Sequence, residues 1–244
     1  MNFFRDLFKF TLPDQLSSNA SLVDDIYFFI NGISLIVFVI LTLVILYFIV
    51  KYRRGNNRKS EPSPSHNDVL EATWTIIPAI IFVAIALWGW RVYSRLQNPP
   101  EGAEQIRVLG KQWSWEFTYA VGDKTIKTAN ELFVPVDTPV VLDMTSVDVV
   151  HSFFVPSFRV KKDVVPGMRT KVWFSANKEG DYRIYCAEMC GTNHSKMYGF
   201  VKVLSKENYS NWLNGQAVKS TSKSPALMGK DLFTQKGCNS CHTV

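Results

Sequence analysis

Two long uncharged stretches near the N-terminus dominate the hydrophobic pattern of the chain. Residues 26–50 contain no charged side chain, and a second uncharged run extends from Ala72 to Trp90. A helix needs about 20 apolar residues to cross the hydrocarbon core of a bilayer. We therefore predict transmembrane helices at 26–50 and 72–93. A cleaved signal peptide and a buried core helix are the weaker alternatives, because a mixed-polarity segment precedes the first run and a basic segment follows it.

The charges around these stretches predict an orientation. Basic residues gather in the 51–71 loop, whereas the preceding segment, 1–25, is rich in Asp. Loops rich in Lys and Arg stay in the cytoplasm. We therefore expect a plasma (inner) membrane protein with two spans, and with both termini on the outer or periplasmic side. The basic residues of the loop are Lys51, Arg53, Arg54, Arg58 and Lys59.

Beyond the second predicted span the pattern changes to short alternating segments separated by turn signals. Such alternation, with β-branched residues, is typical of an all-β sandwich or barrel. We place this domain at residues 94–214, with strands at 105–119 and in four later segments and a short helix at 206–213. A polar linker, 215–225, and a final piece, 226–244, follow. The four later segments are 139–146, 169–176, 181–186 and 198–205.

Composition narrows the function classes. The chain has 244 residues, of which 47% are hydrophobic and 20% charged, which excludes a disordered protein. Four Cys are too few for a disulfide scaffold. The net charge of +6 is divided between the cytoplasmic loop and the exported part, which carries 19 Lys and Arg against 14 Asp and Glu from Ser94 onward. We therefore expect no nucleic-acid partner.

One predicted loop gathers soft metal-ligating side chains. Cys186, Cys190, His194 and Met197 lie within twelve residues, and His151 stands at the predicted start of a strand. A thioether adds little to a zinc site, so this set favours copper. Alone, the two Cys would suggest a disulfide in an oxidising compartment. The His and Met beside them favour a metal site.

The C-x-E-x-C-x-x-x-H-x-x-M loop, with its upstream D-V-V-H-S, resembles the binuclear CuA site of cytochrome c oxidase subunit II. The segments LEATWTIIPA, KQWSWEFTY and VPSFRVKKDVVPG strengthen the resemblance. It implies a membrane-anchored all-β protein, in which a two-helix transmembrane hairpin precedes a cupredoxin-like Greek-key β-barrel. It also implies bridging thiolates, one imidazole on each copper and two weak axial ligands. These ligands are Cys186 and Cys190, His151 and His194, and Met197 and the carbonyl of Glu188.

The resemblance implies roles for three further groups. The Glu188 carboxylate would help to hold Mg²⁺ at the interface with subunit I. Trp113 would be the aromatic residue through which electrons arrive. Glu71, at the cytoplasmic end of the second span, would mark a site of proton uptake. Sheet packing and a solvated carboxylate at a helix start are the ordinary alternatives for Trp113 and Glu71.

A second redox motif lies near the end of the sequence. Cys238-Asn-Ser-Cys241-His242 is the C-x-x-C-H signature of covalent haem c attachment, with His242 as an iron ligand. The preceding LMGKDLFTQKG resembles the first helix of a cytochrome c. The sequence thus resembles subunits II that carry a C-terminally fused cytochrome c domain, here truncated at Val244.

Together these features predict subunit II of a haem–copper oxidase. It would accept electrons from cytochrome c, or from its own haem, and pass them to subunit I. There oxygen is reduced to water and protons are pumped, in a complex that also includes subunit III. The alternatives are a membrane-anchored copper-delivery protein and the CuA subunit of a nitrogen-oxide reductase. The basic exported part favours a tethered haem, or an acidic or neutral donor.

Overall fold

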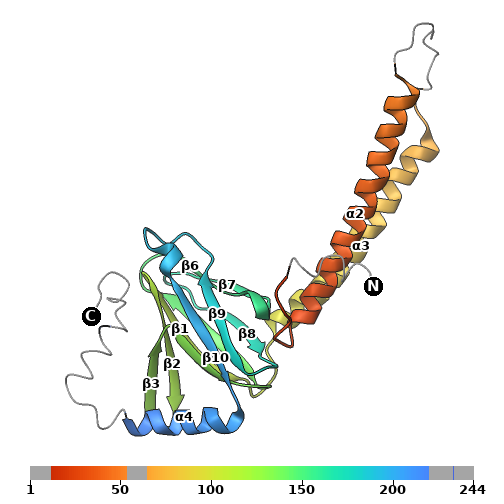
Figure 1. Cartoon of the computed structure of the whole chain (residues 1–244). Helices are drawn as coiled ribbons and strands as arrows, with labels where there is room; N and C mark the ends of the chain where they lie inside the picture. The colour runs from red at the N-terminus through yellow and green to blue at the C-terminus, as the bar shows by residue number, and fades with distance from the viewer. Residues whose placement is uncertain (1–11, 54–64, 220–232, 234–244) are drawn as a thin grey trace. The chain divides into compact units, whose positions relative to one another are not determined.

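The computed structural model describes residues 12–53, 65–219 and 233. The chain divides into two units. Residues 22–93 contribute the membrane-spanning helices of the first. The second consists of residues 12–21 together with the chain from Ser94 onward, and it contains every strand of the described residues (Figure 1).

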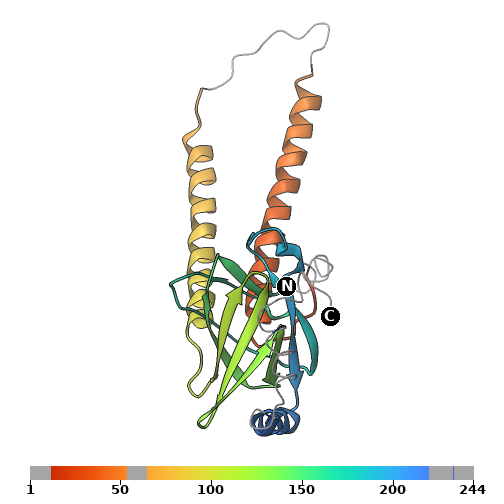
Figure 2. The ribbon, with the colours of Figure 1, turned by 90° about the vertical axis from the view of Figure 1, so that its left-hand side faces the viewer.

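The helical unit consists of α2 (Ala20–Lys51) and α3 (Asp68–Gln97). Most of their apolar side chains are exposed, as expected of helices whose surroundings are lipid, although Phe28 near the start of α2 is buried. Phe29, near the start of α2, packs on Trp88, near the end of α3, with ring centroids 5.2 Å apart. The two helices therefore run antiparallel, as predicted, and Figure 2 shows both along their full length.

Both helices are longer than the predicted spans. At the start of α3, the side-chain oxygen of Asn67 accepts a hydrogen bond from the backbone N–H of Leu70 at 3.0 Å. This is the contact of an N-cap residue, which satisfies a helix N–H that has no partner within the helix. Polar first and last turns thus extend each helix beyond its apolar stretch.

The second unit is built from two five-stranded sheets. The strand orders are β3-β2-β1-β5-β8 and β4-β10-β9-β6-β7. The pairs β1/β5 and β4/β10 are parallel, and the other pairs are antiparallel. This confirms the predicted all-β domain after a two-helix anchor. The strands are β1 (Glu104–Lys111), β2 (Ser114–Val121), β3 (Lys124–Ala129), β4 (Glu131–Pro135), β5 (Pro139–Ser146), β6 (His151–Val155), β7 (Val160–Val164), β8 (Thr170–Ser175), β9 (Gly180–Cys186) and β10 (Tyr198–Leu204).

Alternate side chains of both sheets meet in one apolar core. Trp115, Phe117 and Tyr119 alternate along β2 and are fully or almost fully buried in it. Phe153 of β6 packs edge-on against Trp115, with centroids 5.6 Å apart. This close packing makes the sheets a rigid support for the residues at their ends.

Two predicted boundaries need correction. The segment 105–119 is two strands, because the chain turns at Gln112 and Trp113 between β1 and β2. The predicted helix 206–213 is longer, since α4 spans Lys206–Lys219 and includes the first part of the predicted 215–225 linker. Trp212 of α4 stacks on Phe133 with centroids 4.3 Å apart, which attaches this helix to the sheet.

The segment before α2 belongs to the β unit. The backbone N–H of Leu16 donates to the carbonyl of Ser157 at 3.0 Å, and the Ser17 hydroxyl donates to that of Phe158 at 2.8 Å. Ser17 also forms an isolated β-bridge with Ala176. These contacts attach the segment before α2 to the β domain that follows α3.

Candidate metal centre

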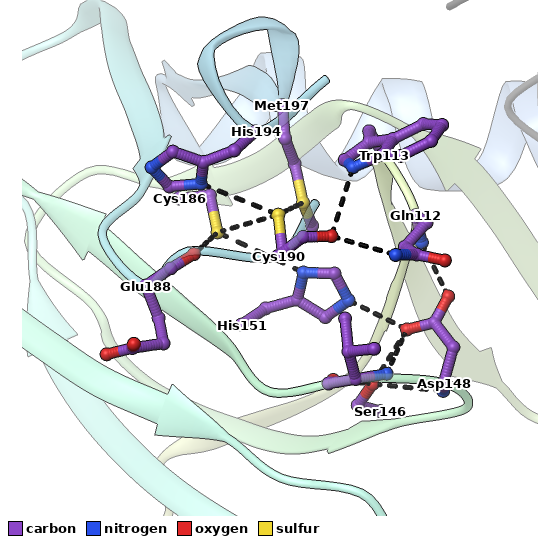
Figure 3. A network of polar contacts seen from close by, with 11 residues as sticks. Gln112, Trp113, Ser146, Asp148, His151, Cys186, Glu188, Cys190, His194 and Met197 are labelled. Atoms are coloured by element: carbon purple, nitrogen blue, oxygen red, sulfur yellow. Dashed lines mark hydrogen bonds and ion pairs between the residues drawn. The ribbon is translucent and has the colours of Figure 1, made fainter. Parts of the chain in front are cut away.

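The end of one sheet brings together the side chains of the predicted copper loop (Figure 3). His151 begins β6 and Cys186 ends β9, and these strands are paired antiparallel. The loop after Cys186 contains Cys190 and the short 3₁₀ helix η3 (His194–Lys196), and Met197 follows just before β10. His151, Cys186, Cys190 and Met197 are all buried.

The sulfur and nitrogen atoms of these side chains lie close together. The Sγ atoms of Cys186 and Cys190 are 3.7 Å apart, and both cysteines are free. The Nδ1 atom of His151 is 3.9 Å from Cys186 Sγ, and that of His194 is 3.5 Å from Cys190 Sγ. The thioether sulfur of Met197 lies 3.8 Å from Cys190 Sγ. The two thiols are thus flanked by one imidazole each.

These separations fit shared metal ligands better than a disulfide. A disulfide bond is about 2.05 Å long. Two sulfurs on one tetrahedral metal, at about 2.3 Å each, are about 3.8 Å apart, and a sulfur and an imidazole nitrogen are about 3.5 Å apart. His151, Cys186 and Cys190 form a potential metal site, with ligand atoms all within 4.8 Å of one another. The soft sulfur donors match copper.

Glu188 presents two different groups. Its backbone carbonyl oxygen lies 3.2 Å from Cys186 Sγ. Its carboxylate points away from the sulfur atoms in Figure 3. The residue therefore places a carbonyl oxygen beside the Cys186 thiol and directs its carboxylate away from both thiols.

The two thiols differ in acidity. Burial disfavours the thiolate of Cys186, but hydrogen bonds from His151 and backbone groups outweigh it and lower the pKa to about 6. Burial and the adjacent Cys186 charge raise the pKa of Cys190 to about 12. The electrostatics thus favour the thiolate at Cys186 and the thiol at Cys190. A metal that takes both sulfurs must displace the second proton, so loading depends on pH.

A carboxylate that sequence reasoning did not single out holds His151. Asp148 Oδ1 lies 2.9 Å from His151 Nε2, which leaves Nδ1 directed at Cys186. Burial works against ionisation of Asp148, but hydrogen bonds from Gln112, His151 and Val149 bring its pKa below the usual value. Burial disfavours the imidazolium of His151, but Cys186 and Asp148 raise its pKa overall. Asp148 thereby fixes the imidazole in orientation.

Trp113 reaches the centre from the β1–β2 turn. Its side chain is half-buried, and its indole N–H donates a hydrogen bond to the carbonyl of Cys190 at 3.2 Å. The side-chain amide of Gln112 donates to the same carbonyl at 2.8 Å. The other three aromatic residues of the run, on β2, are core residues, as the packing alternative predicts.

Two other groups of predicted site residues lie outside the described part of the β unit. Glu71 is exposed in the first turn of α3, in the helical unit. The haem motif, Cys238, Cys241 and His242, lies outside the described residues.

Comparisons with known proteins bear on the whole arrangement. Residues 7–92 match the family profile "Cytochrome C oxidase subunit II, transmembrane domain", and residues 121–204 match "Cytochrome C oxidase subunit II, periplasmic domain". Cytochrome c oxidase subunit 2 of Cereibacter sphaeroides is 33% identical over 72% of this chain and 69% of its own length. Cytochrome c oxidase subunit 2 of Alkalihalophilus pseudofirmus is 31% identical over 87% of this chain and 65% of its own length.

One solved structure is similar to part of the chain. The periplasmic domain of subunit II of cytochrome oxidase of Bradyrhizobium japonicum is 28% identical, with a TM-score of 0.47, over 50% of this chain and 99% of that domain. The chain spans about two thirds of the length of the two curated relatives above. The chain matches both family profiles, and it is 33% identical to the Cereibacter sphaeroides subunit over 69% of that protein's length. The chain therefore belongs to the cytochrome c oxidase subunit II family.

Proposed function

We propose that this chain is the electron-accepting subunit of a haem–copper oxidase, with a binuclear copper centre held by Cys186, Cys190, His151 and His194. One observation carries the proposal: two free, buried thiols 3.7 Å apart, each with an imidazole nitrogen within 4 Å. Met197 and the carbonyl of Glu188 would complete the set as weak ligands. A copper pair supplies one-electron transfer when it is bound.

The protein contributes rigidity and exclusion of water. His151 and Cys186 lie on paired strands, and both ends of the Cys190 loop continue directly into strands. Ligands held this way move little when the charge at the site changes, which lowers the cost of each electron transfer. Burial of the sulfurs also protects them from oxidation by solvent species.

We propose that electrons arrive through Trp113 and leave toward subunit I of the oxidase. The indole is half-buried and is one hydrogen bond from the carbonyl of Cys190. Only the covalent bonds within Cys190 then separate this carbonyl from the sulfur atom of the same residue. A donor that touches the exposed edge of the indole would therefore have a short, continuous route to the metal pair.

Rapid mixing of the assembled oxidase with a reduced c-type cytochrome tests this function. Trp113→Phe should slow reduction of the copper centre at least tenfold while its absorption spectrum is retained. Trp90→Phe, which makes the same change in α3, should leave the rate unchanged. Equal rates in wild type and Trp113→Phe would remove Trp113 from the route. Failure of any c-type donor to reduce the wild-type centre would contradict the proposed function.

Three further assignments belong to the proposal. The outward carboxylate of Glu188 would help to bind Mg²⁺ at the contact with subunit I, and subunit III would complete the complex. Glu71, exposed at the start of α3, would take up protons from the cytoplasm. Cys238, Cys241 and His242 would hold a covalent haem c, which a peroxidase stain of the denatured subunit would reveal.

The proposed orientation places the β unit outside the cytoplasm. Residues 12–21 belong to this unit, so the chain leaves it at the start of α2 and returns to it after α3. The predicted 51–71 loop at the other end of the helices is rich in Lys and Arg. The excess of basic residues from Ser94 onward favours a tethered haem, or an acidic or neutral donor. Fast turnover with a basic cytochrome c, falling steeply with salt, would contradict that choice.

A further inference from the structure

The β1–β2 turn contacts both of the chain segments that supply the central ligands. Gln112 lies at the tip of this turn and is exposed. Its backbone N–H donates to Asp148 Oδ2 at 2.7 Å, and its side-chain Nε2 donates to the carbonyl of Cys190 at 2.8 Å. One residue thus uses two different groups to reach two segments that are far apart in sequence.

The backbone contact acts on the histidine side of the centre. Asp148 uses its second carboxylate oxygen, Oδ1, to hold His151 Nε2 at 2.9 Å. The carboxylate also accepts the backbone N–H of Val149 and the hydroxyl of Ser146, at 2.6 and 3.2 Å. Gln112 is therefore one of several donors here, and this side keeps its support if only the Gln112 side chain is changed.

The side-chain contact acts on the cysteine side, where support is sparser. The carbonyl of Cys190 accepts hydrogen bonds only from Gln112 and Trp113, among the described residues. Gly191 makes both approaches possible. A Cβ atom at Gly191 would stand 3.0 Å from Gln112 Nε2 and 3.4 Å from a ring carbon of Trp113, and its φ of +114° suits only glycine.

We propose that Gln112 is a positioning residue of the metal centre, whose side-chain amide fixes the Cys190 segment relative to His151. Its backbone N–H would stay bound to Asp148 in any variant except proline, so the two contacts can be separated by mutation. This inference rests on the proposed function, because the role of positioning Cys190 assumes that Cys190 is a copper ligand. Both contacts join protein groups, so the first measurement addresses them directly and uses the chain without copper.

The test is hydrogen–deuterium exchange of the full chain, purified without copper in detergent and read by mass spectrometry of peptides. Gln112→Met keeps the length of the side chain but removes the donor, and Gln112→Glu places an acceptor against the carbonyl. The matched control is Gln105→Met, the same change at an exposed position of β1. Peptides from β5 and β8 report whether each variant is folded.

We expect exchange in the 187–197 segment to be about 5- to 10-fold faster in Gln112→Met, the effect of losing one net hydrogen bond. Gln112→Glu should exchange at least as fast, and Gln105→Met should match wild type. If the Gln112 side chain only filled space, the 187–197 segment would exchange at nearly the wild-type rate in Gln112→Glu and faster in Gln112→Met. That order, or wild-type exchange in Gln112→Met, would overturn the proposal.

A second readout uses the copper-loaded chain. Gln112→Met should shift the reduction potential and broaden the cysteine-derived absorption band, while Gln105→Met should change neither. An unchanged potential and band in Gln112→Met would also overturn the proposal. If wild type itself bound no copper pair, the proposed function would fail, whereas the exchange result for Gln112 would be unaffected.

Discussion

Gly110→Ala tests whether the space under His151 is as tight as the structure indicates. A Cβ atom at this position of β1 would stand 3.1 Å from His151 Cδ2, and 3.4 Å from side-chain carbons of both Trp115 and Val164. Carbon atoms pack best at about 3.5–4.0 Å, so the imidazole must retreat by about 0.4 Å. It cannot turn freely, because Asp148 holds its Nε2 atom and Trp115 packs against the ring.

The expected cost follows from these contacts. Overpacking of a core costs about 1–3 kcal/mol, and the lower chain entropy of Ala in the unfolded state returns about 0.4–1 kcal/mol. A net loss of about 0.5–2 kcal/mol should lower the Tm of the β unit by about 2–8 °C. Since a shift of about 0.4 Å is close to the tolerance of a preorganised site, copper affinity should also fall, by about tenfold.

Thermal unfolding followed by Trp fluorescence measures the first effect, and competition with a copper chelator measures the second. Gly215→Ala is the matched control, because no atom lies near its Cβ position in α4 and Ala favours a helix. It should be neutral or slightly stabilising. If Gly110→Ala behaved like Gly215→Ala in both assays, the argument that glycine makes room for His151 would be wrong.

Three other substitutions test separate parts of the account. Glu116, mostly buried, has a pKa below its usual value, because hydrogen bonds from Lys127 and a second lysine outweigh burial. The ionised Glu116 carboxylate therefore stabilises the fold at pH values above the pKa of this group in the unfolded chain. This stabilisation is lost as the pH falls through its lower pKa in the folded chain. Denaturant titrations should show Glu116→Gln about 1–2 kcal/mol less stable at pH 7, with the gap closing in acid. A stability difference between wild type and Glu116→Gln that did not change with pH would contradict this assignment. Asp148→Asn removes the charge that orients His151, so copper affinity should fall about 10- to 100-fold in a chelator competition. An unchanged affinity would show that the contact is incidental. Met197→Leu should keep the copper pair but shift its reduction potential, as a redox titration would detect, because weak axial ligands tune such sites. A wild-type potential would exclude Met197 as a ligand.

The sequence was informative wherever chemistry or periodicity is local. Uncharged runs predicted the two helices, and soft ligands at short spacing predicted a copper loop whose side chains indeed lie together. His151 could be added because the other histidines were assigned elsewhere. The polar ends of the helices were missed since their signals, such as Asn67 as N-cap, lie outside the apolar pattern.

Contacts between distant segments could not be read in this way. Asp148 stands in the same short motif as His151, a signal that could have been followed, but its second partner, Gln112, is 36 residues away. The break between β1 and β2 was hidden because the alternation of aromatic residues continues through the turn. Gly110 carries no side chain to suggest a role, and only the approach of His151 in space reveals one.

The number of copper ions bound per chain, with the electron paramagnetic resonance spectrum of the loaded protein, decides whether the metal centre is binuclear. A binuclear centre requires two copper ions per full chain and one unpaired electron shared between them. Two equivalent copper nuclei then give a seven-line hyperfine pattern. Cys186→Ser or Cys190→Ser should abolish that pattern, because in the proposed centre each thiolate would hold both metals. A colourless protein with one Cu(I), or a four-line spectrum from a single copper, would contradict the account.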